Sequence, residues 1–135
     1  MKIETVKATP VTIDFAEPEI WSQGIRRGVT AIVVEVITDE GLVGIGESIP
    51  APSPEVTLAA IESVSRILVG HDPRKIHRRW LDMQSFGGWC SFPYVGNAAL
   101  AGIEIACWDI LGKSLGVPIH ALLGGAIRSH VPIMG

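Results

Sequence analysis

Apolar and polar residues alternate along the first part of the chain and recur at helical spacing along the rest. The strongest strand pattern is 30–38, TAIVVEVIT, which is dense in β-branched residues. A turn at 39–41 and an apolar return over 42–47 predict a hairpin. Looser alternation over 2–13 predicts another strand. Pro10 places that strand at a sheet edge or a bulge, because proline cannot donate to a ladder.

The segment 14–27 follows neither period, and we expect it to be a long loop. Loops of this length are uncommon in compact domains and are more often functional or mobile than connective. This one carries three large apolar side chains: Phe15, Ile20 and Trp21.

Three helices are predicted after the strands. Ser53 and Pro54 are typical of a helix start, and the helical spacing continues to Gly70. A second start at Asp72-Pro73 leads to a helix that we expect to end by Gly87. Three strands followed by three helices indicate an α+β fold with the helices on one face of the sheet.

The third helix is expected to be long and buried on more than one side. It runs from an N-cap at Asn97 to a left-handed glycine at Gly116, and it is apolar nearly all round. Asp109 and Lys113 are spaced to form an i,i+4 ion pair. Small residues recur every four positions and let another backbone approach closely: Ala98, Gly102 and Ala106.

Composition narrows the function classes. The chain has 135 residues, 47% of them hydrophobic, which is enough for one packed domain. A net charge of −3 argues against a nucleic-acid or anionic-membrane partner. The apolar runs are too short for a membrane span, and we expect no secretory signal. Cys90 and Cys107 lack metal or redox spacing, so the cytoplasm is the expected compartment.

The stretch 102–125, GIEIACWDILGKSLGVPIHALLGG, resembles the end of the N-terminal capping domain in the mandelate racemase/muconate lactonizing enzyme group of the enolase superfamily. The phrases at 41–47 and 71–83 are similar to the same family. The resemblance implies a three-stranded antiparallel meander followed by a three-helix bundle over 1–125. It also implies that 126–135 is a linker and the start of the first strand of a catalytic (β/α)₈ barrel, the rest of which is absent.

The same resemblance implies what the parent enzyme does. Members abstract a proton α to a carboxylate, with a Lys or His base and Mg²⁺ on the ene-diolate. The base and the metal ligands come from the barrel, and none maps onto this chain. We therefore expect no catalytic residue and no metal ligand here, and a fragment that is inactive alone. The parent would be a racemase, a cycloisomerase or an acid-sugar dehydratase acting on a small carboxylate.

By position in the family, two segments of this chain, 14–27 and 50–54, would close over the barrel mouth and select the substrate. Arg26 or Arg27 could bind a substrate carboxylate with two hydrogen bonds. Alternatively, the apolar side chains of 14–27 fold back on the sheet. The candidate specificity residues are Ile20, Trp21, Ser22, Arg26, Pro50 and Ala51.

Other candidates are assigned structural roles. Glu47 is expected to make a structural hydrogen bond, and the basic residues of 74–79 are expected to form a solvated face. The four histidines share no metal-ligand spacing: His71, His77, His120 and His130. Exposed apolar side chains in 14–27 and 131–135 predict a homo-oligomer. The alternative function is a stand-alone interaction module that keeps the fold and binds a protein partner.

Overall fold

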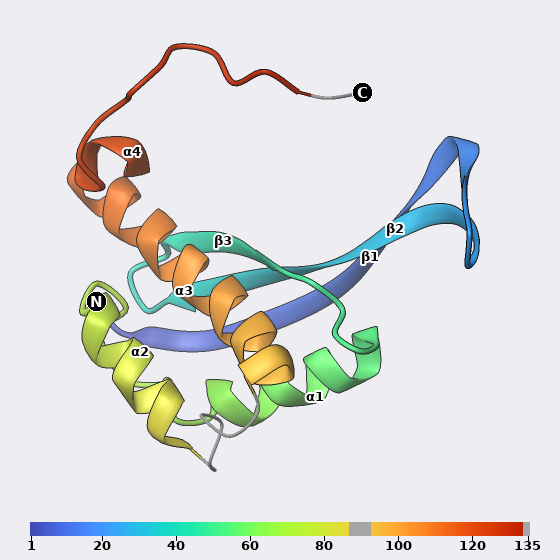
Figure 1. Ribbon diagram of the computed structural model, residues 1–135. Coiled ribbons are helices and arrows are strands. Elements are labelled where there is room, and N and C mark those ends of the chain that lie inside the picture. The colour runs from blue at the N-terminus through green and yellow to red at the C-terminus, as the bar shows by residue number, and fades with distance from the viewer. Residues whose placement is uncertain (87–92, 134–135) are drawn as a thin grey trace.

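The computed structural model describes residues 1–86 and 93–133. Within them, an antiparallel sheet of strand order β1-β2-β3 is covered by helices, which confirms the α+β prediction (Figure 1). The elements are β1 (Ile3–Trp21), β2 (Gly24–Thr38), β3 (Val43–Ser48), α1 (Pro54–Ser65), α2 (Ile76–Ser85), α3 (Pro93–Leu115) and α4 (Ile119–Leu122).

The core lies between the sheet and the helices. On β2, the side chains of Ile32, Val34 and Val36 are fully buried, and the residues between them are half-buried. They join a cluster from α1, α2 and α3 that includes Ile103 and Cys107. Burying each such aliphatic side chain contributes about 1.5–3 kcal/mol. The alternation of buried positions along β2 therefore fixes which sheet face the helices cover.

The expectation of a long loop over 14–27 is wrong. The first two strands continue outward as a paired ribbon, with Ile20 opposite Ile25 and Trp21 opposite Gly24 (Figure 1). A register shift places residues 15–18 opposite Arg27 alone, between the pairs Asp14–Gly28 and Glu19–Arg26. Pro18 lies inside this bulge, where no ladder donor is needed. Pro10 lies on the edge strand, as one of its two predicted placements required.

The helices differ from prediction mainly at their ends. The first ends at Ser65 instead of continuing to Gly70, and the second begins at Ile76 after a turn in which Asp72 accepts from the amide of Arg74. The third begins at Pro93, so Asn97 lies inside it. Gly116 has the expected left-handed backbone, with φ of +67°. Gly87 and Cys90 fall outside the described residues.

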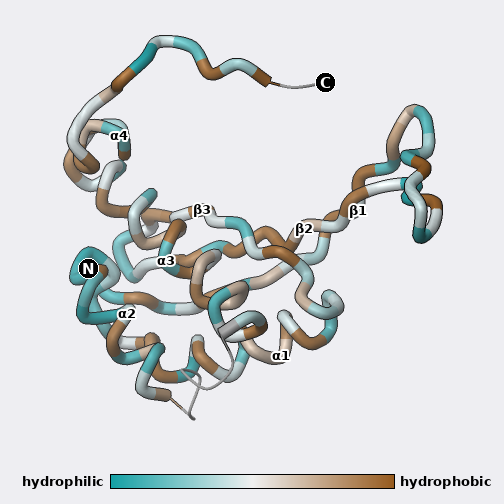
Figure 2. Tube along the Cα trace, in the orientation of Figure 1, coloured by the Kyte–Doolittle hydropathy of each residue, from teal (hydrophilic) through white to brown (hydrophobic). Residues whose placement is uncertain are grey.

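The third helix is the centre of the fold. By length and composition alone, Tyr94–Leu115 could cross a membrane, although Glu104 and Asp109 interrupt its apolar run. However, 56% of the most apolar 18-residue stretch of this helix is buried inside the protein, as in a core helix. Figure 2 shows apolar positions along this helix, and also along the hairpin and the segment after α4. Ile127 and Ile133 in that last segment are more than 90% exposed.

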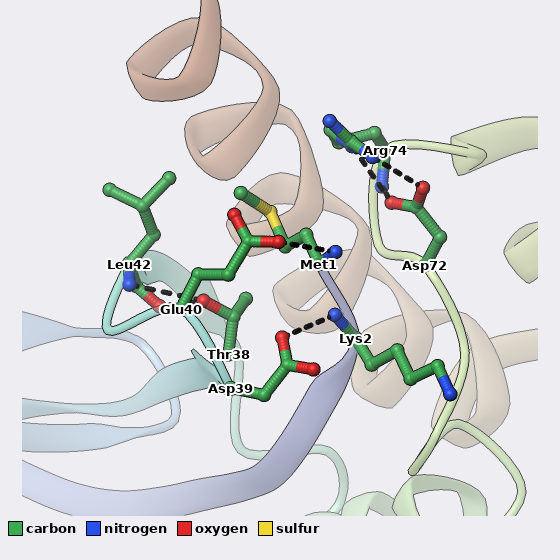
Figure 3. A network of polar contacts seen from close by, with 8 residues as sticks. All are labelled: Met1, Lys2, Thr38, Asp39, Glu40, Leu42, Asp72 and Arg74. Carbon is green, nitrogen blue, oxygen red and sulfur yellow. Dashed lines mark hydrogen bonds and ion pairs between the residues drawn. The ribbon is translucent and has the colours of Figure 1, made fainter.

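Polar contacts tie the N-terminus to the β2–β3 turn (Figure 3). The amide of Lys2 donates to Asp39 at 2.7 Å, and the terminal amino group of Met1 pairs with Glu40. In the turn itself, the buried hydroxyl of Thr38 accepts from the amide of Leu42 at 3.0 Å and donates to the carbonyl of Leu42 at 2.9 Å. The turn and the chain start are thereby fixed to each other.

Candidate functional site

The outer end of the β1–β2 hairpin carries three large exposed apolar side chains. Ile20 is 79% exposed, Ile25 57% and Trp21 51%. They do not fold back on the sheet, because the bulge at 15–18 carries the ribbon beyond it (Figure 1). Ile20 and Ile25 are direct cross-strand partners and so lie on one face of the ribbon. Ser22 is an exposed turn residue between the two strands.

Arg26 lies on the side of the bulge toward the hairpin tip, opposite Glu19. Its guanidinium carbon lies 5.6 Å from the centroid of the Phe15 ring, and its Nη1 lies 3.7 Å from a carboxylate oxygen of Glu19. The cation–π contact spans the bulge, and contacts of this kind at exposed sites contribute about 0.5–1 kcal/mol. The Arg26 side chain is still 44% exposed. It is therefore partly oriented while its remaining donors stay open to solvent.

The second predicted segment follows β3. Pro50 is half-buried. Ala51, also among the predicted specificity residues, is only 1% exposed in this domain, because its methyl group packs inside. Its backbone is fixed as well, because its amide donates to the Thr57 hydroxyl at 2.9 Å. The sequence of 49–54, IPAPSP, does not indicate which of these side chains points into the domain.

The hairpin base and this proline-rich segment form the two walls of a shallow groove of about 400 Å³. Of the predicted residues, Arg26 and Pro50 line it, whereas Ile20, Trp21 and Ser22 lie farther out on the hairpin. Arg26 supplies the charge in the lining. The other lining residues are Gly28, Val29, Thr30, Ile49, Pro52, Pro54 and Tyr94.

Sequence reasoning missed Tyr94 and Thr30 in this groove. Tyr94 stands in the first turn of α3 and is 67% exposed, and its only sequence signal was an aromatic pair before the long helix. The Thr30 hydroxyl shares a 2.9 Å hydrogen bond with that of Thr12 on the neighbouring strand. With Arg26, these hydroxyl groups give an otherwise apolar groove the polar contacts that orient a small ligand.

Two of the remaining candidates have structural partners. Asp109 accepts from Lys113 at 2.7 Å and from the amide of Ile45 at 2.8 Å, which confirms the predicted ion pair. The basic face of α2 is not fully solvated as expected: Arg79 is 6% exposed and donates to Asp82 at 2.6 Å.

The potential metal-ligating side chains of the described residues are not arranged to bind Mg²⁺. Among residues 1–86 and 93–133, no group of three or more His, Cys, Asp or Glu side chains is placed to hold a metal ion. Mg²⁺ requires several oxygen ligands in near-octahedral geometry. We therefore derive no chemistry of this chain from a metal ion bound by its own residues.

Comparison with known proteins gives one consistent family. Residues 3–124 match the family described as mandelate racemase / muconate lactonizing enzyme, N-terminal domain. A D-galactonate dehydratase from Ralstonia pickettii is 41% identical over 98 residues, covering 73% of this chain and 25% of that protein. The chain thus spans about a quarter of this curated relative.

Two solved structures carry the same fold. A dipeptide epimerase from Enterococcus faecalis, crystallised with Mg and the dipeptide L-Leu-L-Tyr, is 30% identical with a TM-score of 0.78, covering 93% of this chain and 35% of that one. The N-succinyl Arg/Lys racemase from Bacillus cereus is 29% identical with a TM-score of 0.80, covering 95% and 35% respectively.

Proposed function

Because this chain belongs to the N-terminal domain family of mandelate racemase and muconate lactonizing enzymes, we propose that it is the substrate-covering domain of a longer enzyme. The parent reaction we propose is removal of a proton from the carbon next to a carboxylate, in which Mg²⁺ supplies stabilisation of the developing ene-diolate charge. Within that enzyme this chain selects the substrate and does not carry the reaction. The proposed compartment is the cytoplasm.

One observation carries this proposal: an exposed tryptophan and two exposed isoleucines lie at the end of a hairpin that extends past its own core. Large exposed apolar side chains in such a place mark a surface that contacts something else. Loops and ribbons held by a rigid scaffold are also where proteins concentrate binding residues. The groove at the base of the hairpin supplies a concave surface next to it.

The groove favours a small organic acid. The Arg26 guanidinium is partly exposed, so N–H groups that Glu19 does not engage are open to a ligand. A planar guanidinium binds a carboxylate through two parallel hydrogen bonds. The hydroxyls of Thr30 and Tyr94 suit a substrate that carries hydroxyl groups of its own. Among racemase, cycloisomerase and acid-sugar dehydratase, we therefore propose the dehydratase. Curated relatives named D-galactonate dehydratase support the same choice.

A chimaera tests this function. In it, this chain replaces the matching N-terminal quarter of the Ralstonia pickettii dehydratase, and turnover of sugar acids is measured with Mg²⁺. Trp21→Ala should raise KM about five- to tenfold with a smaller change in kcat, because the lost contact is made before and during the reaction.

Trp80→Ala is the matched control. Trp80 is also a partly exposed tryptophan, at 40%, but it lies on α2 beside His77 and Glu104 and does not line the groove. This control should leave KM within about twofold of the unmodified chimaera, as surface substitutions usually do. Equal effects of the two substitutions would refute a covering role for the hairpin.

A further inference from the structure

One buried hydroxyl holds the proline-rich wall of the groove. Thr57 lies in the first two turns of α1 and is fully buried. Its Oγ1 accepts from the amide of Ala51 at 2.9 Å. The same oxygen lies 3.3 Å from the carbonyl oxygens of Ile49 and Ala51, to one of which it donates its proton. The hydroxyl thus contacts the backbone on both sides of Pro50.

These contacts matter because the segment has few backbone donors. Prolines occupy positions 50, 52 and 54, and proline has no backbone N–H. The buried amide of Ala51 would be left unpaired without the Thr57 hydroxyl, and an unpaired buried amide is costly. Pro50, Pro52 and Pro54 form one wall of the groove that Arg26 and Thr30 line from the other side. The position of this wall therefore depends on a side chain that does not itself line the groove.

We propose that Thr57 is a positioning residue for substrate selection, acting through the backbone of Ile49–Ala51 to set the proline wall. The proposal rests on the proposed function, since the groove must face a substrate for its shape to matter. Thr57 makes no contact with substrate in this account.

The first test uses the 135-residue chain and needs no ligand. Hydrogen exchange of the Ala51 amide, followed by NMR, should be as slow as that of core amides such as Val34. In Thr57→Val, which keeps the shape but removes the hydroxyl, exchange at Ala51 should accelerate at least about tenfold. Thr57→Ser restores the hydroxyl and should return the rate to within about threefold of the original. Fast Ala51 exchange in the unmodified chain would overturn the proposal even if Thr57→Val fails to fold.

The second test measures the same variants in the chimaera. Thr57→Val should raise KM about tenfold with kcat within about threefold, and Thr57→Ser should restore KM. Thr38→Val is the matched control, because Thr38 is also a buried threonine whose hydroxyl bonds a turn, at the opposite end of β2. It should lower stability without changing KM.

The outcomes separate the two proposals. If Trp21→Ala raises KM but Thr57→Val does not, the covering function is supported and the positioning role of Thr57 is rejected. If Thr57→Val frees the Ala51 amide but neither substitution changes KM, the proposed function fails, and with it the link to selection. If Thr38→Val raises KM as much as Thr57→Val, the effect is one of general stability and the positioning role is rejected.

Discussion

Two glycines of β3 decide how closely α3 approaches the sheet. A β-carbon on Gly44 would lie 2.0 Å from the carbonyl oxygen of Ala106, and one on Gly46 would lie 1.9 Å from that of Gly102. Because α3 also carries core residues such as Ile103 and Cys107, it cannot shift to make room without disturbing the core. The small-residue row on α3 and the alternate glycines of β3 are therefore two halves of one contact.

A single ion pair gives the fold a measurable pH dependence. The hydrogen bond from the Arg74 side chain lowers the pKa of Asp72 from its usual 3.8 to about 2 (Figure 3). Since the folded state holds the proton less tightly than the unfolded chain, the stabilisation is complete above about pH 4 and is lost as the pH falls through about 2.

NMR titration of the Asp72 carboxyl carbon checks this value. The midpoint should lie near 2 in the unmodified chain and rise toward 3.8 in Arg74→Met, which removes the donor but keeps the aliphatic stem. A midpoint that does not move in the variant would show that Arg74 is not the cause.

Among the elements, α3 also closes the free edge of the sheet. β3 is an edge strand, whose outward amides and carbonyls would otherwise be unpaired. Asp109 accepts from the amide of Ile45, and Lys113 donates to the carbonyl of Val43 at 2.7 Å while pairing with Asp109. This side-chain pair replaces a neighbouring strand over one turn of the helix.

The edge contacts should be measurable as a coupling energy. Asp109→Ala should destabilise the fold by about 1–2 kcal/mol, because it leaves the Ile45 amide without its acceptor and removes the carboxylate that pairs with Lys113. The double variant with Lys113→Met should lose less free energy of unfolding than the sum of the losses in the two single variants. Urea unfolding of the two single variants and the double variant gives the coupling.

The matched control is the exposed i,i+4 pair of Glu62 on α1 and Arg66 just after its end, which meet at 2.8 Å but are at least 70% exposed. Their coupling should be within about 0.5 kcal/mol of zero. A coupling for Asp109 and Lys113 no larger than this would show that the contacts to β3 contribute nothing.

Element types were predictable from the sequence, because hydrophobic periodicity and helix caps are local signals. The outer part of the β1–β2 hairpin was not predictable, because Pro18 and Gly24 are typical of loops. The pairing of Ile20 with Ile25 is recognisable only once the bulge at 15–18 is known. Only two of the nine residues that line the groove were predicted: Arg26 and Pro50 followed from the family resemblance. The inward turn of Ala51 and the hydroxyl of Thr57 depend on tertiary contacts.

For the whole molecule, the uncovered apolar surface is the dominant feature. In addition to the residues at the hairpin tip, Val131 and Ile133 are exposed in the segment after α4. Ile45 in β3 and Ile49 just after it are more than half exposed. Apolar surfaces of this kind mark contacts with other protein. They support the proposal that a barrel of the parent enzyme covers part of this domain, and self-association of the isolated chain stays a prediction.

The central claim is that this domain selects substrates and leaves the reaction to other residues. The most direct measurement is α-deuterium exchange into a panel of sugar and aromatic acids, catalysed by the chimaera with the hairpin intact or with residues 19–26 replaced by a two-glycine turn. We predict that exchange continues while the ratio of kcat/KM between the best and worst acids falls at least about tenfold. An unchanged ratio after removal of the hairpin would contradict the claim.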